Sequence, residues 1–197
     1  MHLWCVPLTL ARPALRSILA GYLGVQAGRV PLGRAPGGKP CLDGGAGPAF
    51  NLSHSGPLAV IAVSTRDTVG VDIEQLRGRS RDGLIDRVLD AEEAEVVRAC
   101  VPAKRERAFL RHWTAKESCL KAWGTGLSGD LRALRIGNAL GSPIVMGDAA
   151  SQLELQRFDP CPDVVGTVAV SGGPWRAVSL TFTSDCLVAP DPLATRN

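Results

Sequence analysis

The fold is constrained most by three short apolar segments that follow one another closely: Ala49–Ser55, Leu58–Ser64 and residues 68–74. Each has the length of a β-strand, and only Gly56-Pro57 and residues 65–67 separate them. Connections this short join antiparallel neighbours, because a parallel pair needs a crossover of about a dozen residues or more. The sequence therefore predicts an antiparallel meander in this region.

Helical patterns lie on both sides of the three segments. Residues 11–24 carry an apolar stripe at helical spacing that ends at Gly24, and residues 31–48 are a Gly- and Pro-rich loop. Downstream, the pattern predicts helices over 84–89, from Asp90 to about Cys100 and over roughly 104–123, then strands at 144–146, 153–158, 164–170 and 177–183. The mixture indicates an α+β chain, and the basic, glycine-containing residues 75–83 are the best candidate for a boundary between two halves.

Composition narrows the function classes. The 197 residues are enough for one large domain or two small lobes. A formal net charge of +3 is too mild for a dedicated nucleic-acid binder, but it suits an enzyme with a polyanionic small ligand or an acidic protein partner. The six cysteines are scattered, without Cys-x-x-Cys or paired histidine spacing, which indicates reduced thiols in a cytoplasmic protein rather than a zinc site.

Neither a membrane span nor a signal peptide is favoured. The longest apolar run, at residues 58–63, has only the length of a strand. The N-terminus is apolar, but it lacks a basic opening and is interrupted by Arg12 and Arg16. We therefore expect a cytoplasmic protein without membrane attachment.

Two carboxylates alternate with aliphatic residues in the third segment. Asp72 and Glu74 share one face of the strand, whereas Val71 and Ile73 occupy the other. Neighbouring carboxylates repel and raise one another's pKa, and a divalent cation such as Mg²⁺ relieves the repulsion. The alternative is an amphipathic strand whose outer face happens to be acidic, and the pattern alone leaves both open.

Further polar residues lie beside these segments. Ser53 and His54 end the first segment, where hydroxyls next to an imidazole suit a phosphate, although the Gly-x-Ser-x-Gly pattern of serine hydrolases is absent. Lys39 lies in the loop at 31–48 without the spacing of a Walker loop, so a flexible connector is its ordinary interpretation.

The helix expected over 104–123 carries charges at regular spacing. Trp113, Glu117 and Lys121 occupy every fourth position, so they stack along one side of the helix, where they could hold an acid and a cation against a ligand. Upstream, Asp90 and Glu93 fit a capping box, which gives Glu93 a purely structural interpretation.

Four motifs in this order resemble those of the Sfp-type 4′-phosphopantetheinyl transferases: Gly38-Lys-Pro40, Phe50-Asn-Leu-Ser-His-Ser55, Gly70-Val-Asp-Ile-Glu74 and Trp113-Thr-Ala-Lys-Glu-Ser-Cys-Leu-Lys121. The resemblance implies a pseudo-dimer of two similar α+β lobes with antiparallel sheets and an active site in the cleft between them. We place the lobes at residues 1–80 and 81–188, followed by a loose tail at 189–197.

The resemblance also implies a reaction. Family members move the phosphopantetheine arm of coenzyme A onto a serine of an acyl, peptidyl or aryl carrier protein and release adenosine 3′,5′-bisphosphate, with Mg²⁺ as cofactor. Carrier proteins are generally acidic, so residues 77–81 and 98–111, which are rich in arginine, are candidate docking contacts. We expect a monomer that binds neither nucleic acid nor membrane.

The motifs assign site residues by the same resemblance. Asp72, Glu74 and Glu93 would hold Mg²⁺ against the pyrophosphate. Glu117 would take the proton from the carrier serine, and Lys121 would stabilise the leaving bisphosphate, so that both count with Asp72 as catalytic. The coenzyme A contacts would come from Arg12, Lys39, Ser53, His54 and Lys121, with Lys116 as a further motif member.

One departure concerns the start of the chain. Only eleven residues precede Arg12, and none of them is Lys or Arg, whereas family members usually carry further basic residues there. Unless the sequence starts late, coenzyme A would be held by fewer cations, and its binding would be weaker and more sensitive to salt.

Two other functions fit parts of the pattern. A Mg²⁺-dependent hydrolase of a nucleotide pyrophosphate would share the carboxylates and cations but would leave a carrier protein unchanged. A non-catalytic protein that only binds coenzyme A or a carrier would have no turnover for Glu117→Gln to change.

Overall fold

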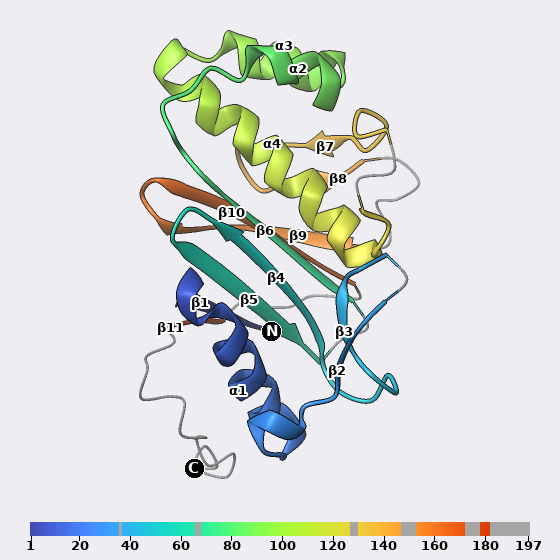
Figure 1. Ribbon diagram of the computed structural model, residues 1–197. Coiled ribbons are helices and arrows are strands. Elements are labelled where there is room, and N and C mark those ends of the chain that lie inside the picture. Colours follow the sequence, from blue (N-terminus) through green and yellow to red (C-terminus); the bar gives the residue numbers. More distant parts are fainter. Residues whose placement is uncertain (36, 66–67, 127–129, 147–152, 172–177, 182–197) are drawn as a thin grey trace.

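The computed structural model describes residues 1–35, 37–65, 68–126, 130–146, 153–171 and 178–181. These residues form two main sheets, each with a long helix packed against it (Figure 1). The α+β class and the predominance of antiparallel strands are therefore confirmed.

The first sheet has the strand order β11-β1-β5-β4. Its strands are β1 (His2–Pro7), β4 (Ala49–Ser55), β5 (Leu58–Ser64) and β11 (Val178–Thr181). β5 is antiparallel to both β1 and β4, whereas β1 and β11 run parallel. The hairpin of β4 and β5 matches the predicted bounds.

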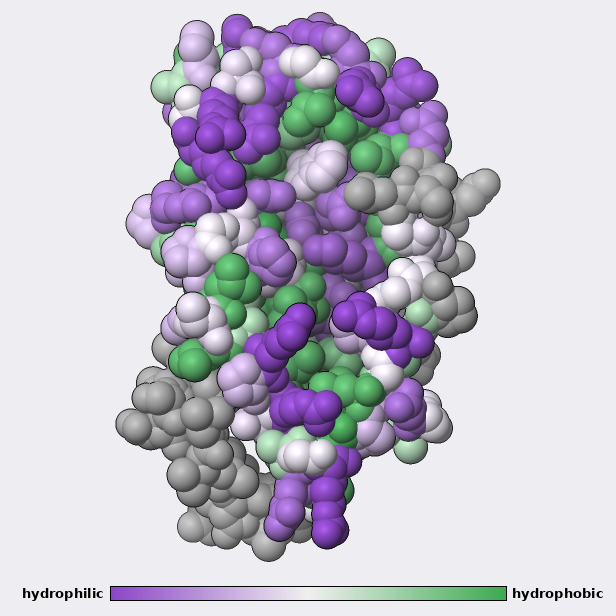
Figure 2. Space-filling model, viewed as in Figure 1, coloured by the Kyte–Doolittle hydropathy of each residue, from purple (hydrophilic) through white to green (hydrophobic). Residues whose placement is uncertain are grey.

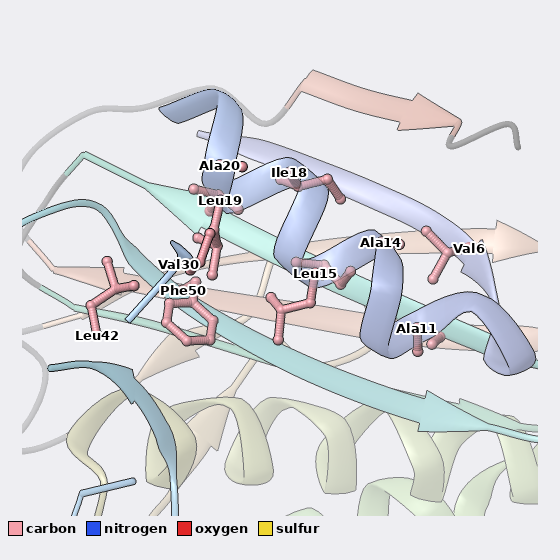
Figure 3. Packing of buried hydrophobic residues seen from close by; sticks show 13 residues of the cluster. Val6, Ala11, Ala14, Leu15, Ile18, Leu19, Ala20, Val30, Leu42 and Phe50 are labelled. Atoms are coloured by element: carbon pink, nitrogen blue, oxygen red, sulfur yellow. The ribbon is translucent and has the colours of Figure 1, made fainter. Parts of the chain in front are cut away.

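Helix α1 (Ala11–Leu23) covers one face of the first sheet. Its apolar stripe is buried, and Figure 3 shows Leu15 and Leu19 pointing toward the sheet, where Phe50 of β4 lies beside them. The helix ends as predicted, because Gly24 adopts a left-handed conformation with φ 66° and its N–H donates to the Ala20 carbonyl.

The second sheet has the order β6-β10-β9, and all its pairs are antiparallel. It consists of β6 (Val69–Gln75), β9 (Leu153–Cys161) and β10 (Val164–Ser171). Helix α4 (Pro102–Trp123) lies directly on β6: a Cβ at Gly70 would lie 2.0 Å from the Ser118 carbonyl oxygen. The glycine of this motif is therefore required by the close approach of helix and strand.

Two shorter helices lie on the outer side of α4 (Figure 1). They are α2 (Asp82–Val88) and α3 (Ala91–Ala99). Asp90 and Glu93 form the predicted capping box at the start of α3, with each side chain accepting from the other residue's backbone N–H. Together with α4, these helices bury an apolar cluster that includes Ile85, Val97 and Phe109.

Three expectations about strands were wrong or incomplete. The meander does not form, because β6 pairs with β10 instead of β5 and so belongs to the other sheet. Residues 31–48 contain a short antiparallel pair, β2 (Leu32–Arg34) with β3 (Pro40–Leu42), and β1 was not predicted at all. The last predicted strand is present as Val178–Thr181, and the tail at 189–197 lies outside the described residues.

The remaining elements are short. They are the 3₁₀ turns η1 (Leu8–Leu10) and η2 (Ala27–Arg29) and the two-residue strands β7 (Ile136–Gly137) and β8 (Ile144–Val145). Among the described residues, no helix combines the length and apolarity needed to cross a bilayer. The five cysteines in the described ranges are free thiols.

Candidate functional site

A cleft of about 1250 Å³ opens where α1, β2 and β4 of the N-terminal half face β6 and the end of α4. Figure 2 shows hydrophilic residues gathered in the middle of this face, between α4 and α1. The polar and charged lining residues are Thr9, Arg12, Arg16, Arg34, Ser53, His54, Asp72 and Lys121. Four of the predicted site residues, Arg12, Ser53, His54 and Lys121, therefore share one cavity with Asp72.

Asp72 lies at the inner end of the cleft and is only 5% exposed. Its Oδ1 accepts hydrogen bonds from Lys121 Nζ at 2.6 Å and from Ser53 Oγ at 2.9 Å. Its Oδ2 is buried and has no hydrogen-bond partner among the described residues. One oxygen is thus held by the protein, and the other is left for a ligand.

Glu74 and Glu117 complete an acidic group around Asp72. Glu74 Oε2 accepts from Ser55 Oγ at 2.9 Å. Glu117 is 9% exposed, and within the described ranges its buried Oε1 has no partner. Burial, followed by repulsion from Asp72, raises the pKa of Glu117 to about 7. Burial also raises the pKa of Asp72, although Lys121 and Ser53 oppose that effect.

Lys121 is the cation of this group. Besides its bond to Asp72, its Nζ donates to Ser53 Oγ at 3.1 Å and to the Val71 carbonyl at 3.2 Å. Glu117 and Lys121 lie on one side of α4, as their spacing predicted, and this side faces the carboxylates of β6. Trp113, the third member of the predicted stack, packs on the cluster beneath α2 and α3, with its ring 6.3 Å from that of Phe109.

Arginine side chains surround the outer part of the cleft. Arg12 is exposed at the start of α1, and Arg16 and Arg34 line the same cavity but were not predicted. Arg16 follows Arg12 by one helical turn, so its position on the same face could have been recognised from the sequence. Three arginines therefore line the cleft together with Lys121.

Comparison with known proteins decides the family. Residues 68–169 match the model of the 4′-phosphopantetheinyl transferase superfamily. A 4′-phosphopantetheinyl transferase of Nostoc sp., HetI, is 38% identical over 174 residues, which cover 85% of this chain and 72% of the relative. The chain belongs to the 4′-phosphopantetheinyl transferase superfamily.

Other relatives of the superfamily match over shorter stretches. A putative 4′-phosphopantetheinyl transferase of Synechocystis sp. is 35% identical over 123 residues, 61% of this chain and 50% of the relative. An L-aminoadipate-semialdehyde dehydrogenase-phosphopantetheinyl transferase of Xenopus laevis is 33% identical over 135 residues, 62% of this chain and 45% of the relative. The chain spans about half the length of these two proteins. The holo-[acyl-carrier-protein] synthase of Thermotoga maritima aligns with a TM-score of 0.43 and 21% identity over 53% of this chain and 62% of the other.

Two residues that the superfamily resemblance assigned to ligands have structural partners instead. Glu93 does not join Asp72 and Glu74, because its carboxylate accepts from Lys116 Nζ at 2.6 Å and from the Ile136 N–H at 2.7 Å. Lys116 is fully buried and cannot reach coenzyme A in the cleft. The two side chains form an ion pair between α3 and α4, so the metal role of Glu93 and the coenzyme A role of Lys116 are corrected.

Lys39 is also directed away from the cleft. Its Nζ donates to the Lys121 carbonyl at 2.6 Å and to the Val69 carbonyl at 2.9 Å. The neighbouring loop touches the same helix end, since a Cβ at Gly37 would lie 2.8 Å from the Gly124 carbonyl oxygen. The lysine therefore joins the loop between β2 and β3 to the C-terminal end of α4, and its predicted grip on the nucleotide is corrected.

Proposed function

We propose that the chain transfers the 4′-phosphopantetheine arm of coenzyme A to a serine of an acidic apo carrier protein and releases adenosine 3′,5′-bisphosphate. The observation that carries this proposal is the cleft itself: arginines line its outer part, Asp72 pairs with Lys121 at its inner end, and the buried carboxyl of Glu117 lies near enough to feel the charge of Asp72. Membership of the superfamily supports the same reaction.

The cations suit the charge of coenzyme A. The co-substrate carries a 3′-phosphate and a pyrophosphate, and guanidinium groups bind phosphate oxygens through paired hydrogen bonds. Arg12 would bind the nucleotide end, with His54 beside it near the end of β4. Arg16 and Arg34 would contribute the guanidinium nitrogens that do not already donate to the Val30 and Gly38 carbonyls. A volume of about 1250 Å³ exceeds that of most small-ligand pockets, which suits a ligand of this size.

A divalent cation fits the inner end of the cleft. Asp72 Oδ2 is buried without a partner among the described residues, and the carboxylates around it repel one another. Asp72 and Glu74 would hold Mg²⁺, which when bound neutralises charge on the pyrophosphate. Within the described ranges, no three His, Cys, Asp or Glu side chains are grouped to hold a metal by themselves, so water and phosphate oxygens would complete the set.

In the proposed reaction, Glu117 would accept the proton of the carrier serine. A base works best when its pKa lies near the working pH, and the pKa of Glu117 is raised to about 7. The proton would pass from the serine hydroxyl to the free Oε1 as the serine oxygen bonds to the phosphorus that carries the phosphopantetheine arm. The bond from this phosphorus to the bridging pyrophosphate oxygen would break, and adenosine 3′,5′-bisphosphate would leave. Lys121 would donate to the leaving phosphate oxygen, because its Nζ already lies beside Asp72.

The test is a transfer assay read by intact-protein mass. The full chain is incubated with coenzyme A, Mg²⁺ and a panel of apo acyl, peptidyl and aryl carrier proteins. One phosphopantetheine group should be added, and chelation of the metal or Glu117→Gln should abolish the addition. An unchanged carrier together with cleaved coenzyme A would instead identify a hydrolase, and coenzyme A binding without turnover would identify a binding protein. The carrier class, the cytoplasmic location and the monomeric state stay predictions.

A further inference from the structure

Between the adjacent strands β4 and β6, three polar side chains of β4 take the place of backbone-to-backbone hydrogen bonds. β4 and β6 lie next to each other but in different sheets, so no strand of the described ranges accepts hydrogen bonds from the N–H groups of β6 on this side. Each of three β6 N–H groups donates instead to a β4 side chain: Val71 to Asn51 Oδ1 at 2.9 Å, Ile73 to Ser53 Oγ at 3.3 Å and Gln75 to Ser55 Oγ at 3.0 Å. The side-chain ladder advances two residues at a time on both strands.

The two serines of this ladder also donate hydrogen bonds to carboxylates. Ser53 Oγ donates to Asp72, and Ser55 Oγ donates to Glu74 Oε2, both at 2.9 Å. A hydroxyl has one hydrogen and two acceptor lone pairs. Because a backbone N–H of β6 occupies a lone pair of each serine, the hydroxyl hydrogen is left to point at the carboxylate. The backbone thus fixes the direction in which each serine donates.

Asn51 makes the ladder bond without this second contact. Its amide oxygen accepts from Val71, and the residue of β6 beside that N–H is Gly70, which has no side chain to orient. The ladder therefore has one purely structural member and two members that hold a carboxylate. Ser53 also contacts Lys121 and lines the cleft, whereas Ser55 does neither, so Ser55 isolates the effect on a carboxylate.

We propose that Ser55 is a positioning residue that fixes the orientation of Glu74 for cation binding. The proposal rests on the proposed function, in which Asp72 and Glu74 hold the metal ion. A glutamate without such a partner can rotate about its side-chain bonds, and cation binding would then have to restrict that rotation. Loss of a residue that orients a metal ligand typically lowers metal affinity by about 10- to 100-fold.

The experiment compares Ser55→Ala with Asn51→Ala, because each variant removes one ladder bond and only the first removes a bond to a carboxylate. Mn²⁺ is titrated into the full chain, and the free ion is followed by electron paramagnetic resonance. Ser55→Ala should raise the Mn²⁺ dissociation constant by about tenfold, and Asn51→Ala should leave it within about twofold of the wild-type value. Ser55→Thr, which keeps the hydroxyl, should recover most of the affinity.

Two further measurements, unfolding in urea and transfer activity, distinguish a role of Ser55 in positioning Glu74 from a role of the ladder in supporting the fold. Equal loss of Mn²⁺ affinity in Ser55→Ala and Asn51→Ala would show that the ladder only supports the fold, and an unchanged affinity in Ser55→Ala would also overturn the proposal. If wild-type protein transfers phosphopantetheine while Ser55→Ala binds Mn²⁺ normally, only the positioning role fails. If wild-type protein neither binds Mn²⁺ nor modifies a carrier, the proposed function fails with it.

Discussion

Replacement of Lys116 by methionine should destabilise the fold without changing the cleft. Lys116 is 0% exposed, and its Nζ donates to Glu93 Oε2 at 2.6 Å, to the Leu131 carbonyl at 2.9 Å and to the Val88 carbonyl at 3.1 Å. Methionine keeps most of the volume of the side chain, so the change removes mainly the charge and its hydrogen bonds.

The loss of stability is set by Glu93, the partner that stays buried after the substitution. Glu93, only 5% exposed, would keep the Ile136 and Asp90 N–H groups but lose its ammonium partner. Breaking a buried ion pair in this way costs about 3–5 kcal/mol. Burial lowers the pKa of Lys116 in spite of the pair, so the pair itself stabilises the fold by less than its rupture costs. The double change Lys116→Met with Glu93→Gln should therefore lose less than about 2 kcal/mol.

The dependence of stability on acidic pH is a second test of the ion pair between Lys116 and Glu93. Burial alone would raise the pKa of Glu93, but the His112 ring, 3.7 Å from Oε1, and hydrogen bonds from Lys116 and the Ile136 N–H lower it to about 2. Since this value lies below the ordinary 4.5, the carboxylate stabilises the wild-type fold above about pH 4.5, and the contribution is lost as the pH falls through 2. In Lys116→Met the pKa of Glu93 should rise, so mild acid should reduce the penalty of the variant.

The assay is urea unfolding followed by tryptophan fluorescence, at about pH 8 and about pH 5, for the wild type, the single variant and the double variant. Coenzyme A binding is measured in parallel under folding conditions. A Lys116→Met protein within about 1 kcal/mol of wild type that has lost coenzyme A binding would refute the reasoning, because the ammonium would then serve the ligand rather than the core.

Three further changes test the junction of the two sheets. Gly70→Ala should lose about 3 kcal/mol in urea unfolding, because the added Cβ would lie 2.0 Å from the Ser118 carbonyl oxygen, and a loss near zero would contradict the close contact. Lys39→Met should lower the free energy of unfolding by about 1–2 kcal/mol, because two carbonyls, including that of Lys121, lose their donor. Unchanged stability together with weakened coenzyme A binding would show instead that Lys39 binds the ligand. Glu117→Gln should raise the melting temperature in metal-free buffer at about pH 8. The folded pKa of Glu117, about 7, exceeds the ordinary 4.5, so its carboxylate destabilises the fold as the pH rises between these values; a lower melting temperature would contradict this sign.

The elements with a regular pattern could be predicted from the sequence, but their partners could not. β4, β5 and α1 match because alternation, helical spacing and Gly24 are local signals. Alternation in β6 shows which residues share a face, yet it contains nothing about the neighbouring strand. Its partner β10 lies far along the chain: Val168, which stands opposite Val71, follows it by 97 residues, and only tertiary packing brings the two together.

The site shows the same division. The strand face of Asp72 and the common helix side of Glu117 and Lys121 could be predicted, because alternation and helical spacing are local signals. Lys116 lies next to Glu117 in sequence, but one position on a helix is a rotation of about 100°, which turns its side chain toward the α3 layer and Glu93. Lys116 and Glu117 both belong to the motif. The motif alone does not show whether such a lysine binds a ligand or neutralises a buried acid.

The junction between the two sheets joins the chemistry of the site to its stability. Lys39, Lys121 and the serines of β4 all bond across it, so the same contacts that hold the two sheets together also orient Asp72 and Glu74. The unpaired oxygens of Asp72 and Glu117 lie at this junction and keep a repulsion that the described residues do not neutralise. A divalent cation that binds there removes the repulsion, and it should therefore stabilise the protein as it prepares the site for coenzyme A.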